Sequence, residues 1–301
     1  MAERYRFPEG PLVDVAWLAA RSADVEAGRI VVLDATAQLG APTPQERYPV
    51  ASGRPLWEEE HLPGSRHADL LDELSDPAAP YHFSVAGEDR LGAALARLGV
   101  HDGTLVVCYD SGDGSWAARL WWLLRDLGVP AVVLDGGLSA WRAAGQPVTD
   151  SPAAPPPDGP PVRIRTDRRG WASLDDVVAI VEGRRPGALV CALGEGQFTG
   201  AEPTRYPRQG HIPGSRNLPF GGLRAQDGTL RPRAELRAAA EEVVGAPGAT
   251  PLTLYCGMGV SAAGLALGLV AAGYEDLRIY DGSLEEWTAD PERALETGPA
   301  R

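Results

Sequence analysis

The hydrophobic positions of this chain form short, nearly continuous apolar runs that alternate with stretches of helical spacing. The runs that predict strands cover residues 30–33, 105–109, 131–134, 188–191, 252–255 and 277–280. The stretches that predict helices cover residues 88–98, 115–127, 173–181, 233–244 and 262–272. Short strands that are apolar on both faces and alternate with helices are typical of a parallel sheet with helices on both sides. The pattern therefore predicts an α/β fold, with ligands binding at the carboxyl ends of the strands.

An internal repeat organises the chain. Three motifs occur twice and in the same order: His61-Leu-Pro-Gly-Ser65 and His211-Ile-Pro-Gly-Ser215, Tyr109-Asp110 and Tyr255-Cys256, and an Asp-Gly pair followed by Trp141 or Trp287. Asp110 and Cys256 lie 146 residues apart, as do Trp141 and Trp287. This spacing is too long for a solenoid, whose units run to tens of residues. We therefore predict two domains, residues 1–144 and 162–301, joined by an extended Pro-rich linker at residues 145–161.

The segment around Cys256 carries the clearest chemistry. The apolar run 252–255 delivers Cys256 directly into a Gly257-Met-Gly259 turn, and a helical pattern of small residues follows. Glycines allow the turn to curl its backbone N–H groups inward, and the helix N-terminus adds positive potential. Such an environment stabilises a thiolate and makes the sulfur nucleophilic. The alternative interpretation is a buried structural cysteine at a strand end.

Composition limits the partners and the cellular setting. A net charge of −13 argues against nucleic acid and against an anionic membrane surface as partners. All basic residues are arginines, so a lysine Schiff base is excluded, and three cysteines fit neither a disulfide framework nor a zinc site. We expect no metal and no cofactor. The first residues lack a signal-peptide pattern and no apolar run could span a bilayer, so we expect a cytoplasmic monomer.

The repeated motifs and Cys256-Gly-Met-Gly-Val-Ser-Ala262 resemble the two-domain sulfurtransferases, which comprise rhodanese and 3-mercaptopyruvate sulfurtransferase. The resemblance covers residues 10–290. It implies tandem rhodanese-like domains, each a parallel sheet flanked by helices, with a catalytically silent first domain. Asp110 stands where the repeat places Cys256, and an aspartate cannot carry a transferable sulfur atom.

The resemblance also implies the reaction. The Cys256 thiolate would take the outer sulfur of a small anionic donor as a persulfide and pass it to a thiol, cyanide or a protein acceptor, a two-step ping-pong scheme. The backbone amides that would hold this anion belong to Gly257, Met258, Gly259, Val260 and Ser261. The hydroxyl of Ser261 would be a further donor; its other interpretation, as the N-cap of the following helix, is compatible with that role.

The preference for one sulfur donor over another depends on a few residues around the cysteine and on the arginines that would bind the donor. Gly257 is typical of the mercaptopyruvate type, so we expect 3-mercaptopyruvate to be favoured over thiosulfate, although Met258 removes a hydroxyl that this type usually carries. Family members bind the substrate carboxylate with two arginines. Alignment places Gln197 at the first position, Arg205 at the second and Arg208 close behind. An amide in place of a guanidinium gives up a charge-assisted pair, on the order of 1.5–3 kcal/mol.

The family completes its pocket with residues of the first domain. His82 and Asp72 lie in the corresponding segment and are candidates for a proton relay, whereas the competing interpretation of His82 is a solvated loop histidine. Cys191 and Leu193 replace an aspartate and an arginine of the family, and we expect Cys191 to fill space in the core. The Pro-rich segment 38–60 has no predicted function.

Three alternatives compete with a mercaptopyruvate sulfurtransferase. A phosphatase or arsenate reductase needs an arginine six residues after the cysteine to clamp the oxyanion, and that position is Ala262, which excludes this class. A thiosulfate-specific rhodanese and a non-catalytic sulfur-carrier or regulatory tandem module both remain open.

Overall fold

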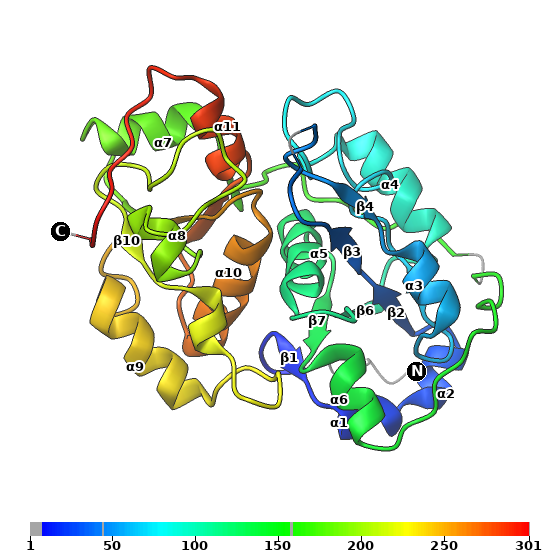
Figure 1. Cartoon of the computed structure of the whole chain (residues 1–301). Coiled ribbons are helices and arrows are strands. Elements are labelled where there is room, and N and C mark those ends of the chain that lie inside the picture. Colours follow the sequence, from blue (N-terminus) through cyan, green and yellow to red (C-terminus); the bar gives the residue numbers. More distant parts are fainter. Residues whose placement is uncertain (1–7, 44, 157–158, 301) are drawn as a thin grey trace.

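Two five-stranded sheets, each with all of its strands parallel, form the framework of the computed structural model (Figure 1), which describes residues 8–300 apart from 44, 157 and 158. The first sheet has the order β1 (Leu12–Val13), β7 (Ala131–Leu134), β6 (Leu105–Tyr109), β2 (Ile30–Asp34), β5 (Arg66–His67). The second has the order β10 (Arg216–Asn217), β9 (Ala188–Cys191), β11 (Leu252–Tyr255), β12 (Leu277–Tyr280), β8 (Trp171–Ala172). The predicted α/β fold is confirmed. Parts of the predicted first domain and linker, residues 1–7 and 157–158, lie outside the described residues.

Helices cover both sheets. Those of the first half are α1 (Val15–Ala19), α2 (Ser22–Glu26), α3 (Arg54–Glu59), α4 (Glu88–Arg97), α5 (Ser115–Leu127) and α6 (Gly137–Ala143). Those of the second half are α7 (Leu174–Val181), α8 (Glu195–Thr199), the 3-10 helix η1 (Phe220–Leu223), α9 (Arg233–Val244), α10 (Val260–Ala272) and α11 (Ser283–Ala289). The long helices match the prediction to within two residues. The short ones were missed, because four to seven residues carry too little periodicity.

The antiparallel hairpin of β3 (Ala37–Leu39) and β4 (Val50–Ser52) departs from the parallel pattern. It lies in the segment 38–60, for which the sequence predicted no function. The apolar period of a strand is interrupted there by prolines and polar residues. The hairpin extends from the end of β2, so it lies at the carboxyl edge of the first sheet, where a site is expected.

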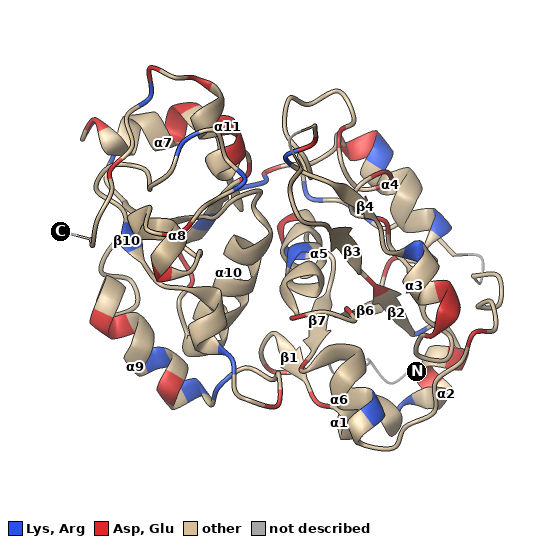
Figure 2. Ribbon diagram, viewed as in Figure 1, with Lys and Arg blue, Asp and Glu red and all other residues tan. Residues whose placement is uncertain are grey.

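The two halves pack against each other through α5 and α10, which face one another at the centre of Figure 1. Helix α10 carries no charged residue (Figure 2) and is buried along most of its length. One apolar cluster runs across this boundary and includes Trp121 and Trp122 of α5 and Leu265 and Leu269 of α10. Because each helix follows directly after the loop at the end of a central strand, this packing brings both loops to the domain interface.

The His-Leu/Ile-Pro-Gly-Ser motifs hold the tyrosines that precede these loops. The hydroxyls of Ser65 and Tyr109 lie 2.9 Å apart, and Tyr255 donates to the Ser215 hydroxyl over the same distance. The backbone N–H that follows each motif histidine donates to the same tyrosine oxygen, at 3.3 and 3.1 Å. The histidine rings themselves are buried and hydrogen-bond to backbone carbonyls. The motifs therefore anchor the central strands.

The spacing of the repeat differs between strands and helices. Asp110 and Cys256 follow strands that are 146 residues apart, but the helix N-caps Gly114 and Gly259 are 145 residues apart. The loop after β6 is therefore one residue longer than the loop after β11. The constant offset seen in the motifs does not extend through the helices.

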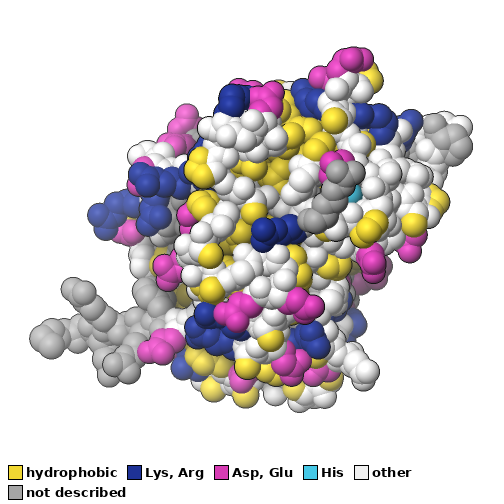
Figure 3. Space-filling model, turned by 90° about the vertical axis from the view of Figure 1, so that its left-hand side faces the viewer, with side chains coloured by type: hydrophobic (Ala, Val, Ile, Leu, Met, Phe, Trp, Pro, Cys, Tyr) yellow, Lys and Arg dark blue, Asp and Glu magenta, His cyan; other side chains and the backbone are white. Residues whose placement is uncertain are grey.

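The surface of the second domain carries charged side chains of both signs. Figure 3 shows the side on which the second domain lies, and acidic and basic side chains are interspersed over it. Within residues 8–300, leaving aside 44, 157 and 158, no helix has the length and apolar character needed to cross a membrane.

Candidate active site

Cys256 lies at the carboxyl end of β11, the middle strand of the second sheet. Two contacts from the start of α11 fix its backbone: the Cys256 N–H donates to the Ser283 hydroxyl at 3.2 Å, and the Leu284 N–H donates to the Cys256 carbonyl at 3.1 Å. The residue is only 2% exposed. The structure therefore places the predicted nucleophile in a closed and rigid setting.

Both glycines of the loop are required by their surroundings. A Cβ on Gly257 would lie 1.4 Å from the hydroxyl oxygen of Tyr206. Gly259 has a φ of +75°, and a Cβ there would lie 2.7 Å from Nη1 of Arg119. A side chain at either position would therefore meet Tyr206 or Arg119, two long residues that lie outside the motif.

Gly259 is the N-cap of α10, so the first turn begins at Val260 and Ser261 is its second residue. The alternative role of Ser261 as the N-cap is therefore wrong, because the left-handed Gly259 takes that position two residues earlier. The first N–H groups of a helix have no partners within it. In α10 these groups belong to residues that follow Cys256 closely in the chain, and we call the backbone of residues 257–261, which we predict to hold an anion, the amide cradle.

Met258 packs into the protein interior. It is 5% exposed and belongs to the apolar cluster that joins the two domains. Its side chain therefore fills space at the interface, which explains why an apolar residue is accepted where the family resemblance predicts a hydroxyl.

Residues of the first domain close over the loop. The ring of Tyr48, which precedes β4, lies 5.9 Å from the ring of Tyr206 and 5.6 Å from that of His82. His82 is held by Glu285, with 2.7 Å between Nδ1 and Oε1 and with the His82 N–H donating to Oε2 at 3.2 Å. Glu285 in turn donates its N–H to the Gly257 carbonyl at 2.9 Å. The hairpin and the His82 segment therefore form the wall of the site.

The electrostatics of this wall centre on Glu285. Its hydrogen bond and negative charge raise the pKa of His82 above the ordinary value. Burial, followed by the charge of Glu285, raises the pKa of Tyr48 to about 12. Glu285 is a residue that the sequence did not single out, and only its position two residues before Trp287 of the repeat marks it.

Asp72 and His82 line the same small pocket of about 250 Å³, together with residues 75–77 and 79–81. The ring partner of His82 is nevertheless Glu285, while Asp72 donates its N–H to Asp69 Oδ1 at 3.0 Å. The structure thus brings the two predicted relay residues to one pocket and gives His82 a different carboxylate.

The predicted substrate-binding residues have distinct surroundings. Arg205 reaches the hairpin of the first domain and donates to the carbonyls of Gly40 and Arg47, both at 3.3 Å. Arg208 donates to the carbonyls of Asp290 and Arg293, at 2.8 and 2.6 Å, beside the C-terminal end of α11. Gln197 is half-buried within α8. Arg205 directly precedes Tyr206, whose hydroxyl lies against Gly257.

The other two cysteines are buried in strands. Cys191 ends β9 beside Tyr255, and burial raises the pKa of its thiol to about 12. Cys108 lies within β6 and is completely buried, which also raises the pKa of its thiol. Both environments keep the sulfur protonated, as expected of cysteines that fill space in the core.

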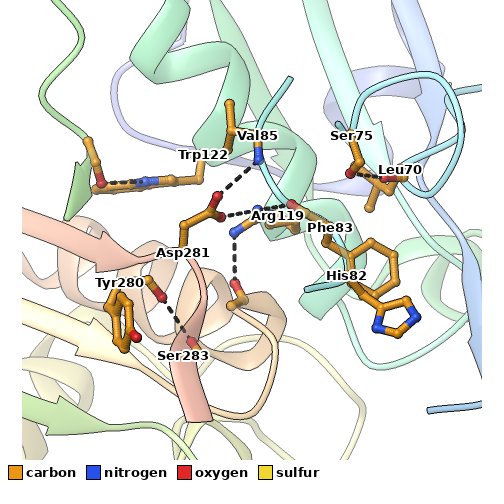
Figure 4. A network of polar contacts seen from close by, with 12 residues as sticks. Leu70, Ser75, His82, Phe83, Val85, Arg119, Trp122, Tyr280, Asp281 and Ser283 are labelled. Atoms are coloured by element: carbon orange, nitrogen blue, oxygen red, sulfur yellow. Dashed lines mark hydrogen bonds and ion pairs between the residues drawn. The ribbon is translucent and has the colours of Figure 1, made fainter. Parts of the chain in front are cut away.

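A charged group beneath the loop was missed in the sequence. Arg119 of α5 is 3% exposed and forms an ion pair with Asp281 at 2.6 Å (Figure 4). It also donates to the carbonyl of Gly259 at 3.3 Å and to the carbonyl of Phe83. Asp281 accepts the N–H of Val85 at 2.9 Å. The one available sign was an arginine within the otherwise apolar run 117–124 of a helix.

Comparison with known proteins agrees with this fold. The model of the rhodanese-like domain matches residues 14–144 and 200–290. Human 3-mercaptopyruvate sulfurtransferase is 36% identical over 251 residues (80% of this chain, 82% of the human protein). Bovine thiosulfate sulfurtransferase is 33% identical over 299 residues (95% of both chains). The structure of SseA from Escherichia coli, described among 3-mercaptopyruvate sulfotransferases, has a TM-score of 0.75 and 26% identity, covering 91% of this chain and 99% of SseA.

The fold and the matches define tandem rhodanese domains. This chain belongs to the tandem rhodanese-domain sulfurtransferases, of the thiosulfate/3-mercaptopyruvate type.

Proposed function

We propose that the protein transfers sulfur from 3-mercaptopyruvate, through a persulfide on Cys256, to a thiol, cyanide or a protein acceptor. The observation that carries the proposal is the position of Cys256 between the end of a central strand and the N-terminus of α10, directly before the backbone amides of residues 257–261. Developing negative charge is stabilised by such preorganised N–H groups without reorganisation.

In the first step the Cys256 thiolate attacks the sulfur of the donor. The new S–S bond forms as the C–S bond breaks, and the electron pair of that bond leaves on carbon as the enolate of pyruvate, which takes up a proton. An acceptor thiolate or cyanide then attacks the outer sulfur and releases the Cys256 thiolate. For the proton we propose His82, oriented by Glu285, as the relay residue.

The preference for 3-mercaptopyruvate is supported by Gly257. Because Tyr206 occupies the space of a Cβ at this position, the basic side chain expected there in thiosulfate-specific members has no room. We propose Arg205 as the carboxylate ligand: it would exchange two carbonyl acceptors for a carboxylate, a stronger charge-assisted bond. The exchange would also release the hairpin that covers the site.

Intact mass tests the proposal directly. Incubation with 3-mercaptopyruvate should add the mass of one sulfur atom, and the gain should be lost in Cys256→Ser but retained in Cys191→Ser. The value of kcat/KM should be at least ~10-fold higher for 3-mercaptopyruvate than for thiosulfate. Faster reaction with thiosulfate would favour the thiosulfate-specific enzyme, and no adduct from either donor would leave the sulfur-carrier or regulatory module.

The role of Arg205 has its own comparison. Arg205→Gln should raise KM for 3-mercaptopyruvate by roughly 10-fold and leave KM for cyanide unchanged. Arg208→Gln is the matched control, since its guanidinium binds only backbone carbonyls of the 290–293 segment in the structure. Equal effects of the two substitutions would contradict a carboxylate ligand at Arg205.

A further inference from the structure

Arg119 is a buried charge at the centre of an apolar interface. Its side chain is 4% exposed, and the face of Trp171 lies 4.3 Å from its guanidinium carbon. Burying an ion pair costs several kcal/mol of desolvation, and an apolar pair in its place is often as stable. Arg119 and Asp281 therefore call for a role other than joining the domains.

We propose that Arg119, which comes from the first domain, is a positioning residue that holds the amide cradle of the second domain in its anion-binding form. The inference rests on the proposed chemistry of Cys256. Figure 4 shows the guanidinium between the Asp281 carboxylate and the Phe83 carbonyl. The guanidinium also donates to the Gly259 carbonyl.

A single peptide group, between Gly259 and Val260, links Arg119 to the amide cradle. The carbonyl of Gly259 and the N–H of Val260 belong to the same planar trans peptide and point in opposite directions. Fixing the carbonyl on Arg119, at 3.3 Å, therefore fixes the direction of the first N–H of α10. A positive donor on the carbonyl also polarises the peptide and strengthens that N–H as a donor.

The second link is to the wall of the site. Phe83 follows His82 directly and has a φ of +59°, a conformation that side chains other than glycine rarely adopt. Arg119 binds its carbonyl, and Asp281 binds the N–H of Val85, two residues further on. One guanidinium thus sets the position of the His82 segment relative to the cysteine loop.

A second ion pair between the domains provides a matched control. Asp126, also on α5, accepts Nε of Arg168 at 2.9 Å, with side-chain exposures of 3% and 19%. Asp126 lies seven residues beyond Arg119, about 10 Å along the helix. Its other acceptor contacts are to the N–H groups of Arg169 and Gly170, away from the loop. Loss of this pair therefore weakens the interface without touching the cradle.

The experiment compares Arg119→Lys with Arg168→Lys in the full chain. Lysine keeps the charge but loses the planar fork that reaches several acceptors at once. We expect Arg119→Lys to slow single-turnover persulfide formation with 3-mercaptopyruvate by roughly 10- to 100-fold. It should also move the pH midpoint of Cys256 alkylation by iodoacetamide upward. Arg168→Lys should leave both readouts at the wild-type value, while thermal unfolding shows similar losses of stability for the two variants.

Each outcome has one meaning. Wild-type kinetics and an unchanged alkylation midpoint in Arg119→Lys would overturn the inference, as would equal losses in Arg168→Lys. If the wild type itself forms no persulfide, the proposed function fails, and the alkylation midpoint alone then decides whether Arg119 positions the loop. Asp281→Asn removes the ion pair without stranding a carboxylate, and should shift the same midpoint if Arg119→Lys does not fold.

Discussion

The loops after the two central strands have the same place in their domains but hold different groups. In the first domain the Asp110 carboxylate accepts the N–H groups of Gly112 and Gly114, at 2.9 and 3.0 Å, and of Ala117 at 2.8 Å. In the second domain the shorter loop begins with Cys256. The first loop thus directs its amides onto a carboxyl group of the chain itself, whereas we propose that the second holds the anion formed on Cys256.

The turns that hold the backbone of Asp110 and Cys256 also differ between the two domains. Leu138 donates its N–H to the Asp110 carbonyl at 3.0 Å, just as Leu284 does to that of Cys256. The residue before each leucine has a positive φ, +54° at Gly137 and +50° at Ser283. A serine in this conformation costs on the order of 1 kcal/mol or more. At Ser283 the hydroxyl accepts the Cys256 N–H, so strain accompanies a contact to the proposed nucleophile.

Moving the nucleophile between the loops should have the largest effect. We expect Asp110→Cys in a Cys256→Ser background to stay roughly 1000-fold or more below wild-type activity, because the longer loop closes three amides on the side chain and lacks the Arg119 and Tyr206 contacts. Thiocyanate formation from 3-mercaptopyruvate and cyanide is the measurement. Recovery of activity in the double variant would show that only the identity of the residue separates the two domains.

Adding one carbon to the second loop should have the next largest effect. Gly257→Ala places a Cβ against the Tyr206 hydroxyl and should lower kcat/KM by roughly 10- to 100-fold, because the loop must shift. The first loop carries Ser111 at the corresponding position, and Ser111→Ala is the control, with activity unchanged. Tyr206→Leu should restore part of the loss in Gly257→Ala; failure to do so would argue against steric pressure from Tyr206.

The buried carboxylate of the first loop should appear in the pH dependence of stability. Burial outweighs the three amide donors and raises the pKa of Asp110 to about 6. The folded state then holds the proton more tightly than the unfolded state, so the contribution of Asp110 to stability is greatest near pH 4. It should decline as the pH rises through 6, by on the order of 1–3 kcal/mol.

Urea unfolding of the wild type and Asp110→Ala across pH 4–8 measures this contribution as a difference, in which other titrating groups cancel. A pH-independent difference would mean that Asp110 is ionised in the folded protein throughout this range.

The ion pair of His82 and Glu285 should have the smallest effect, on the stability of the protein. The pKa of His82 is raised above its ordinary value of 6.5, chiefly by the hydrogen bond that its ring donates to Glu285. Its contribution to stability is therefore present below pH 6.5 and lost as the pH rises through the raised value. Because the His82 side chain is 34% exposed, solvent screening limits the contribution to about 0.5 kcal/mol.

Thermal unfolding of the wild type and His82→Gln at pH 6 and pH 8 checks this prediction: the difference should be larger at pH 6. Ser139 takes the place of Glu285 in the repeat, so the first domain offers no matching pair. A larger difference at pH 8 would contradict the ion pair.

The sequence predicted the strands and long helices well because the burial of one or both faces gives each of them a regular spacing of apolar residues. The strands 105–109, 188–191 and 252–255 were predicted to the residue. The hairpin at 37–52 was missed, since its polar and Pro-rich composition gives no such period. Ser261 was assigned a possible cap because the exact start of α10 depends on the left-handed turn at Gly259, which a sequence pattern places only to within a residue or two.

The sequence by itself determined the duplicated α/β fold and the presence of sulfur in only one of the two loops. Only the tertiary structure decided what surrounds that sulfur. Arg119 and Gly259 are 140 residues apart, and His82 and Glu285 are 203 residues apart. Local patterns record which face of an element is buried, but these contacts depend on how two complete domains pack. The physical reason is that α5 and α10 must cover each other's apolar faces, and this brings the first domain over the loop of the second.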